Sequence, residues 1–206
     1  MFAPRTLTQR AYVMSLDSSK VPVVVGVGPA GTGKTLFACH VGAQRLREGD
    51  VRRIVMTRPA VSVDEQHGFL PGKLENKMDP WVRPMVDILG NYYSRKQIDE
   101  LMYERIIEIC PLAYMRGRTF DGAWVLADEM QNSTPNQMRM VLTRIGQGSK
   151  MVVTGDTDQH DRGFEENGLA DLLGRVDPDD ELIHVVRFGN ADIQRNKVIR
   201  KILSLY

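Results

Sequence analysis

The sequence predicts an α/β protein with a single core, in which helices cover both faces of a mostly parallel sheet. Short apolar runs rich in β-branched residues alternate with amphipathic segments, as expected for strands joined by crossover helices. A glycine-rich loop of the phosphate-binding type follows the first apolar run directly. The chain has 206 residues, the length of one domain with one sizeable core, so we expect residues 1–206 to form a single domain.

Six apolar runs are expected to be strands, and six amphipathic segments are expected to be helices. The expected strands are residues 21–27, 53–57, 107–113, 124–127, 150–154 and 182–186. The expected helices are residues 36–47, 80–89, 95–103, 136–145, 168–175 and 191–205. The stretch of about residues 60–106 is rich in Gly, Pro and charge. Because it is too long for a simple connection, we expect a partly helical insertion there.

The composition is that of an ordinary globular protein. Hydrophobic residues make up 42% and charged residues 26% of the chain, and the formal net charge is +1, which gives no electrostatic indication of a nucleic-acid partner. The chain does not open on a secretory apolar segment and has no apolar run of membrane-spanning length, so we expect a cytoplasmic protein without a membrane contact. Cys39 and Cys110 are expected to be buried, reduced thiols. The four histidines show no metal-ligand spacing, so no zinc site is expected.

Residues 28–35 read Gly-Pro-Ala-Gly-Thr-Gly-Lys-Thr, a complete G-x-x-x-x-G-K-[ST] phosphate loop. In such a loop the backbone N–H groups surround the β-phosphate, the lysine reaches the β and γ oxygens, and the last hydroxyl ligates Mg²⁺. The alternative is a glycine-rich turn with a chance Lys-Thr pair, which the strand before it and the helix after it disfavour. We expect nucleoside triphosphate to bind to Gly28, Pro29, Ala30, Gly31, Thr32, Gly33, Lys34 and Thr35.

Two carboxylates, Asp128 and Glu129, follow the expected strand 124–127. An open α/β sheet presents its ligands at the carboxyl ends of its strands, so this pair is in the place of the second half of an NTPase site. Asp128 is expected to hold Mg²⁺ through water, with Thr35 as the other metal-binding residue. Glu129 is expected to position or deprotonate the water that attacks the γ-phosphate. The alternative is two surface acids after an edge strand.

Further polar groups follow the expected strand 150–154, in the run from Gly155 to Gln159. A glutamine can accept a hydrogen bond from water and donate one to a phosphate oxygen, so Gln159 is expected to sense the γ-phosphate. An Asp/Thr-rich turn that caps the next segment is the structural alternative.

Other candidates carry weaker signals. Gln9 and Tyr12 precede the first strand and could recognise and stack on an adenine, or could belong to a polar N-terminal helix. Arg58, the Arg116-Gly117-Arg118 run and the basic segment near the C-terminus could contact a polyanion or form solvated faces. Arg195 is a candidate for the cation that stabilises the developing γ-phosphate charge, supplied by a neighbouring subunit if one core cannot supply it in cis.

As a set, these motifs resemble the PhoH family of ATPases, which is related to superfamily 1 helicases. The resemblance covers nearly the whole chain. It rests on the phosphate loop and on the segments 56–60 (MTRPA), 68–72 (GFLPG), 115–119 (MRGRT), 127–132 (ADEMQN) and 152–156 (VVTGD). It implies a single RecA-like core that hydrolyses ATP with Mg²⁺, engages single-stranded RNA and assembles into a ring-shaped hexamer with an arginine supplied in trans.

Two departures bear on what the resemblance implies. The family usually has an Arg-His pair where this chain has Arg195 followed by Asn196, so only the arginine role is carried over. Some relatives carry an attached ribonuclease or RNA-binding domain that this sequence does not contain, so a compact bacterial or phage-encoded form is expected and helicase activity is left open. A role in phosphate starvation belongs to the family's name, and no residue bears on it.

Three functional classes remain open from the residues. The first is an ATPase of the nucleic-acid motor class, built on Lys34, Thr35, Asp128, Glu129 and Gln159 around the γ-phosphate. The second is a non-motor nucleotide switch or assembly scaffold, which would use the same active site. The third is a small nucleotide or metabolite kinase, against which the water-activating Glu129 argues, because kinases must exclude water.

Overall fold

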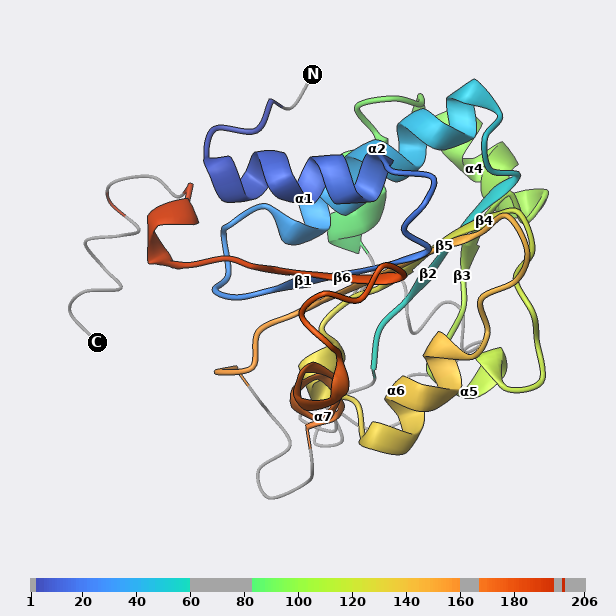
Figure 1. The fold of residues 1–206 in the computed structure, drawn as a ribbon. Coiled ribbons are helices and arrows are strands. Elements are labelled where there is room, and N and C mark those ends of the chain that lie inside the picture. The colour runs from blue at the N-terminus through green and yellow to red at the C-terminus, as the bar shows by residue number, and fades with distance from the viewer. Residues whose placement is uncertain (1–2, 60–82, 160–166, 195–197, 199–206) are drawn as a thin grey trace, which may run out of the picture.

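The computed structural model describes residues 3–59, 83–159, 167–194 and 198. Six strands form one sheet in the order β3-β2-β4-β5-β1-β6, and all of its strand pairs are parallel (Figure 1). The strands are β1 Val23–Val27, β2 Arg53–Thr57, β3 Ile107–Ile109, β4 Ala123–Ala127, β5 Lys150–Gly155 and β6 Ile183–Arg187. The predicted α/β class with a parallel sheet is confirmed.

Helices cover both faces of the sheet (Figure 1). On one face lie α1 Leu7–Asp17, α2 Lys34–Glu48, α4 Arg95–Tyr103 and the helical residues 83–89. On the other face lie α5 Leu112–Met115, α6 Pro135–Leu142 and α7 Gly168–Arg175. Short 3-10 turns occupy Met130–Asn132 (η2) and Asn190–Asp192 (η3). None of the helices within the described ranges is long and apolar enough to cross a membrane.

The sheet separates two hydrophobic clusters, one on each face. Along β4, Trp124 and Leu126 pack into the cluster beneath α1 and α2, whereas Val125 and Ala127 pack into the cluster beneath α6 and α7. A parallel sheet that is buried on both faces needs apolar residues at every strand position, which explains the continuous apolar runs in the sequence. Gly42 of α2 makes room for this packing, because a Cβ there would lie 2.6 Å from the Trp124 indole nitrogen.

Several predicted boundaries differ from the observed ones. The strand expected at residues 107–113 ends at Ile109, and α5 begins after Pro111, which has no N–H to continue the ladder with β2. The helix expected at 136–145 ends at Leu142, where the Thr143 hydroxyl donates to the Arg139 carbonyl oxygen at 2.9 Å. Within the helix expected at 191–205, η3 is an isolated turn, and residues 195–197 and 199–206 lie outside the described residues.

The expected insertion falls partly outside the described chain. Residues 60–82 are not described, and the remainder, up to β3, contains the helical residues 83–89 and α4. A capping box opens α4, in which the Ser94 hydroxyl accepts from the Gln97 N–H and the Gln97 side chain accepts from the Ser94 N–H. The MTRPA motif is described only as far as Pro59, and the GFLPG motif lies outside the described residues.

The strand order determines where the site forms. The central strands β4, β5 and β1 are neighbours, and in a parallel sheet their carboxyl ends meet at one edge. The phosphate loop follows β1, Asp128 and Glu129 follow β4, and Asp156 follows β5. Three segments that are far apart in the sequence are therefore brought to one place.

Candidate nucleotide-binding site

The phosphate loop needs its glycines for conformational reasons. Gly28, Gly31 and Gly33 have φ values of 137°, 82° and 92°, a region that L side chains rarely adopt. At Gly28 a Cβ would also lie 2.3 Å from the carbonyl oxygen of Phe188, so the loop and the segment after β6 are in close contact. Gly33 is the N-cap residue of α2 and no side chain caps that end, so the first N–H groups of the helix can bind an anion at the loop.

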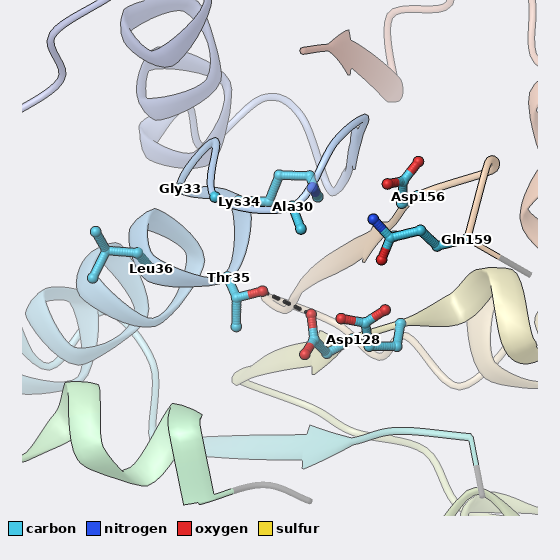
Figure 2. Close-up of a pocket in the computed structure, with 11 residues that line it drawn as sticks. Ala30, Gly33, Lys34, Thr35, Leu36, Asp128, Asp156 and Gln159 are labelled. Carbon is cyan, nitrogen blue, oxygen red and sulfur yellow. Dashed lines mark hydrogen bonds between the residues drawn. The ribbon is translucent and has the colours of Figure 1, made fainter. Parts of the chain in front are cut away.

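Lys34 lies at the wall of the site formed by this loop. Its ammonium donates to the carbonyl oxygens of Gly28 at 2.5 Å and Pro29 at 2.8 Å, and the residue is 9% exposed. The charge therefore remains at the loop and is directed toward the space between Ala30 and Asp156 (Figure 2). A phosphate oxygen at that position would receive a charge-assisted hydrogen bond.

Thr35 and Asp128 form the predicted metal-binding pair. The Thr35 hydroxyl donates to Oδ1 of Asp128 at 2.8 Å (Figure 2), and the Thr154 hydroxyl donates to the same oxygen. Asp128 is 6% exposed, so these bonds hold a buried carboxylate at the end of β4. Hydroxyl and carboxylate oxygens are suitable Mg²⁺ ligands, with water and phosphate oxygens completing the shell. The donor set therefore fits the expected magnesium ion.

Glu129 adopts an unusual backbone conformation. Its φ of 54° lies in the left-handed region, which costs a non-glycine residue on the order of 1–3 kcal/mol and persists only when the surrounding structure enforces it. The Gln131 amide donates to one carboxylate oxygen at 2.6 Å, and Nη2 of Arg58 lies 3.7 Å from the other. Arg58 directly follows Thr57, the register partner of Ala127, which explains this proximity.

These groups surround one cavity of about 230 Å³. Its lining residues are Ala30, Gly31, Gly33, Lys34, Thr35, Leu36, Asp128, Glu129, Gly155, Asp156 and Gln159. Figure 2 shows Asp156 and Gln159 across the cavity from Thr35. Gln159 is exposed and belongs to a turn in which its N–H donates to the Asp156 carbonyl oxygen at 3.2 Å. Gln159 can therefore belong to a turn and also line the cavity. Contact between Gln159 and a phosphate stays a prediction.

The N-terminal candidates have a structural position beside the phosphate loop. Gln9 is 2% exposed; its side-chain Oε1 accepts from the Arg5 and Thr6 N–H groups, and its Nε2 donates to the Thr32 carbonyl oxygen at 3.0 Å. Gln9 therefore connects the start of α1 with the loop, and contact with adenine stays a prediction.

The expected stacking of Tyr12 on adenine does not fit the structure. The residue is 0% exposed and packs edge-on against Phe188, with 5.3 Å between ring centroids. Burial, together with the nearby Asp128 carboxylate, raises the pKa of the Tyr12 phenol well above its ordinary value, so the ring stays neutral. A helix face that is packed against the sheet cannot also present this ring to a base.

Sequence reasoning singled out the segments that contain Thr154, Gln131 and Asp156 but assigned none of these residues a role. Thr154 binds Asp128, the buried Gln131 binds Glu129, and the N–H of Asp156 donates to Gln131 at 3.1 Å. Thr154 and Asp156 follow the general rule that strand ends carry the site, so that rule could have indicated them. Gln131 lies in the ADEMQN segment that carries the family resemblance, but its partner could not be predicted, because η2 turns its side chain toward Glu129 only in the folded chain.

The remaining expectations concern basic and sulfur side chains. Arg118 forms a two-point ion pair with Glu108 and lies over the Phe120 ring, 4.6 Å from its centroid, which gives it a structural role. Cys39 and Cys110 are buried free thiols, as predicted. Burial raises the pKa of Cys110 to about 11, so it stays protonated at neutral pH. Arg195, His67 and His160 lie outside the described residues.

The fold and the site together define the class of protein. A phosphate loop after β1, a carboxylate pair after β4 and polar groups after β5 surround one cavity on a parallel sheet, which is the arrangement of a P-loop NTPase. The chain belongs to the PhoH family, since the family model described as PhoH-like protein matches residues 1–206.

Curated relatives agree with this assignment. The chain is 44% identical over 207 residues to PhoH-like proteins of Mycobacterium tuberculosis and Bacillus subtilis, and 39% identical over 206 residues to Protein PhoH of Escherichia coli. Each match covers 98% of this chain but only 57%, 63% and 57% of the respective relative, so the chain spans about three fifths of their length.

Two solved structures show a more distant similarity. A Sulfolobus solfataricus SWI2/SNF2 ATPase core in complex with dsDNA has a TM-score of 0.47 and 13% identity over 75% of this chain and 32% of that one. The Pif1 helicase from Candida albicans has a TM-score of 0.45 and 14% identity over 100% of this chain and 43% of that one. Both are too distant to bear on function.

Proposed function

We propose that this chain hydrolyses ATP with Mg²⁺ in the 230 Å³ cavity and that hydrolysis is coupled to single-stranded RNA. The observation that carries the hydrolytic part is the carboxylate pair after β4. Asp128 is bound to the Thr35 hydroxyl at the metal position, and Glu129 projects beside it into the same cavity as Lys34. A cation for the phosphates, oxygen ligands for Mg²⁺ and a base for water are the parts that NTP hydrolysis requires.

Each part has a defined task in this mechanism. Lys34 and the first N–H groups of α2 bind the β- and γ-phosphate oxygens. Thr35 and Asp128 would hold Mg²⁺, which would neutralise part of the phosphate charge. Glu129 orients the attacking water and takes its proton, and the developing charge on the γ-phosphate is met by Lys34 and by Gln159.

The kinase alternative is disfavoured by the same geometry. A kinase protects the γ-phosphate from water, whereas here a carboxylate lies next to the metal-binding aspartate in a cavity that also includes the exposed Gln159. A nucleotide switch or scaffold would share this active site. It differs from a motor only in the process to which ATP turnover is coupled.

The RNA and assembly parts of the proposal rest on family membership and on charge. Arg58 lies beside Glu129 at the carboxyl edge of the sheet, where a polyanion could reach it. Among the described residues that line the cavity, Lys34 is the cation, so a second cation supplied by a neighbouring subunit in a hexameric ring would complete the site. Arg195 is our candidate for that role, although it lies outside the described part of the chain.

We expect single-stranded RNA to raise the rate of phosphate release several-fold, because an ATPase coupled to a polymer turns over faster when the polymer is bound. The measurement is steady-state phosphate release by the purified protein with and without RNA, with its mass in solution determined in parallel. The stimulation should weaken as salt is added, since phosphate contacts release counterions. Turnover that is indifferent to RNA at every salt concentration would count against the motor and favour the switch.

A further inference from the structure

We propose that Gln131 is a positioning residue for hydrolysis: its side-chain amide holds the Glu129 carboxylate in place and fixes it relative to the segment after β5. This inference rests on the proposed function, since it assigns Glu129 the role of the base. It adds a residue outside the phosphate loop and the carboxylate pair, and it identifies the N–H donor of the amide as the functional group.

The amide of Gln131 bridges two parts of the site. Nε2 donates to Oε2 of Glu129 at 2.6 Å, and Oε1 accepts from the N–H of Asp156 at 3.1 Å. Gln131 is 1% exposed, so its amide is shielded from bulk water, whereas the Glu129 side chain is 33% exposed and can still reach a water molecule. The end of β4 and the end of β5 are thereby connected through one planar group.

The surroundings leave this side chain little freedom. A Cβ on Gly155 would lie 2.6 Å from Oε1 of Gln131, so the glycine permits the close approach. The backbone of η2 is held by two bonds, from the Asn132 N–H to the Glu129 carbonyl oxygen at 3.0 Å and from the Ser133 N–H to the Met130 carbonyl oxygen at 3.1 Å. A rigid turn that carries a buried amide is a suitable support for a catalytic carboxylate.

The conformation of Glu129 explains why such support matters. A glutamate in the left-handed region is not held in place by its own backbone preference. Arg58 lies farther away, at 3.7 Å, and its side chain is 29% exposed, so the Gln131 amide is the closer and more deeply buried of these two contacts. Because water attack depends on orientation, a displacement of about 1 Å can lower the rate by about 100-fold.

The alternative is that Gln131 serves structure alone, through its acceptor bond to the Asp156 N–H. The positioning role and the structural role can be tested separately, because the Nε2 donor of Gln131 faces Glu129 and its Oε1 acceptor faces Asp156. The variant Gln131→Glu keeps an acceptor oxygen and the size of the side chain but replaces the donor with a second carboxylate oxygen. Gln131→Met keeps the length and removes both bonds without adding charge.

We expect Gln131→Glu to lower kcat by about 10- to 100-fold while the KM for ATP stays within about twofold, because the carboxylate of Glu129 is displaced and ATP binding is not. Gln131→Met should lower kcat similarly. Steady-state phosphate release over a range of ATP concentrations gives these values. Thermal melting of each variant shows whether it is folded.

A matched control and a double mutant complete the test. Gln137→Glu makes the same chemical change in the capping box of α6, where glutamate serves equally well, and should leave kcat unchanged. In the Glu129→Gln background, adding Gln131→Glu should lower kcat by less than about twofold, because the effects of residues that act through one group are not additive.

Two results would overturn the assignment. One is a folded Gln131→Glu protein with the kcat of the wild type, and the other is a full additional loss of rate in the Glu129→Gln background. A wild-type protein without turnover above the Glu129→Gln blank is a different result, because it would reject the proposed hydrolysis itself. The failure of Gln131 as a positioning residue and the failure of the proposed function are therefore distinguishable.

Discussion

Replacing Lys34 by alanine is expected to weaken ATP binding by about 100-fold or more. The ammonium lies at the wall of the cavity, where it would make charge-assisted hydrogen bonds to phosphate oxygens, and each such bond contributes about 1.5–3 kcal/mol. The loss of two therefore exceeds the ~2.7 kcal/mol that corresponds to a 100-fold change in affinity. Calorimetric titration with ATP and Mg²⁺ measures the dissociation constant.

The control for Lys34→Ala is Lys96→Ala, which removes the same charge from an exposed position on α4. The Lys96 side chain is 89% exposed and pairs only loosely with Glu100, at 3.8 Å, so its loss should not change ATP affinity. An unchanged dissociation constant for a folded Lys34→Ala protein would show that ATP does not bind to this loop.

Replacing Glu129 by glutamine is expected to leave ATP affinity within about twofold and to lower turnover by about 100- to 10,000-fold, the range for removal of a general base. The substitution keeps the size of the side chain, so the cavity keeps its shape. It removes the carboxylate proposed to take a proton from the attacking water, while the Asp128 and Thr35 pair that would hold Mg²⁺ is untouched.

Binding and turnover of Glu129→Gln are measured on the same preparation, with Glu100→Gln as the control. Glu100 lies on α4 and makes an exposed pair with Lys96, away from the cavity lining, so both quantities should match those of the wild type. Retained turnover in Glu129→Gln would remove Glu129 from the role of base and would return the carboxylate pair to the status of surface acids.

Much of the fold could be predicted because the sheet is buried on both faces. All six strands were recognised from apolar stretches of the sequence, although β3 has Glu108 between its two isoleucines and β6 is only partly buried. The ends of the strand at 107–113 and of the helix at 136–145 were harder to predict. Pro111 lacks an N–H donor and the Thr143 hydroxyl donates to a backbone carbonyl, and the apolar period reports neither. The turn of η2 likewise has no apolar period, and its backbone is held by the carbonyl oxygens of Glu129 and Met130.

The site residues could be predicted where the chemistry requires a fixed spacing along the sequence. They were harder to predict where their contacts exist only in the folded chain. The phosphate loop is one continuous segment of the sequence and the Asp128-Glu129 pair is another, so each could be recognised by itself. The structure brings the two segments to one cavity. Gln131 was missed because its importance depends on a side-chain direction. Stacking of Tyr12 on adenine was one of two interpretations left open, because a sequence cannot show whether a tyrosine at helical spacing faces the sheet or the ligand.

The central claim is that water attacks the γ-phosphate of ATP in the cavity next to Glu129, and hydrolysis in ¹⁸O-labelled water tests it most directly. Mass spectrometry of the products gives the fate of the labelled oxygen. We predict that the label appears in the inorganic phosphate, that none appears in ADP, and that Glu129→Gln releases almost no labelled phosphate. Label in ADP, or transfer of the phosphate to a small acceptor without label, would contradict the assignment of this site to ATP hydrolysis.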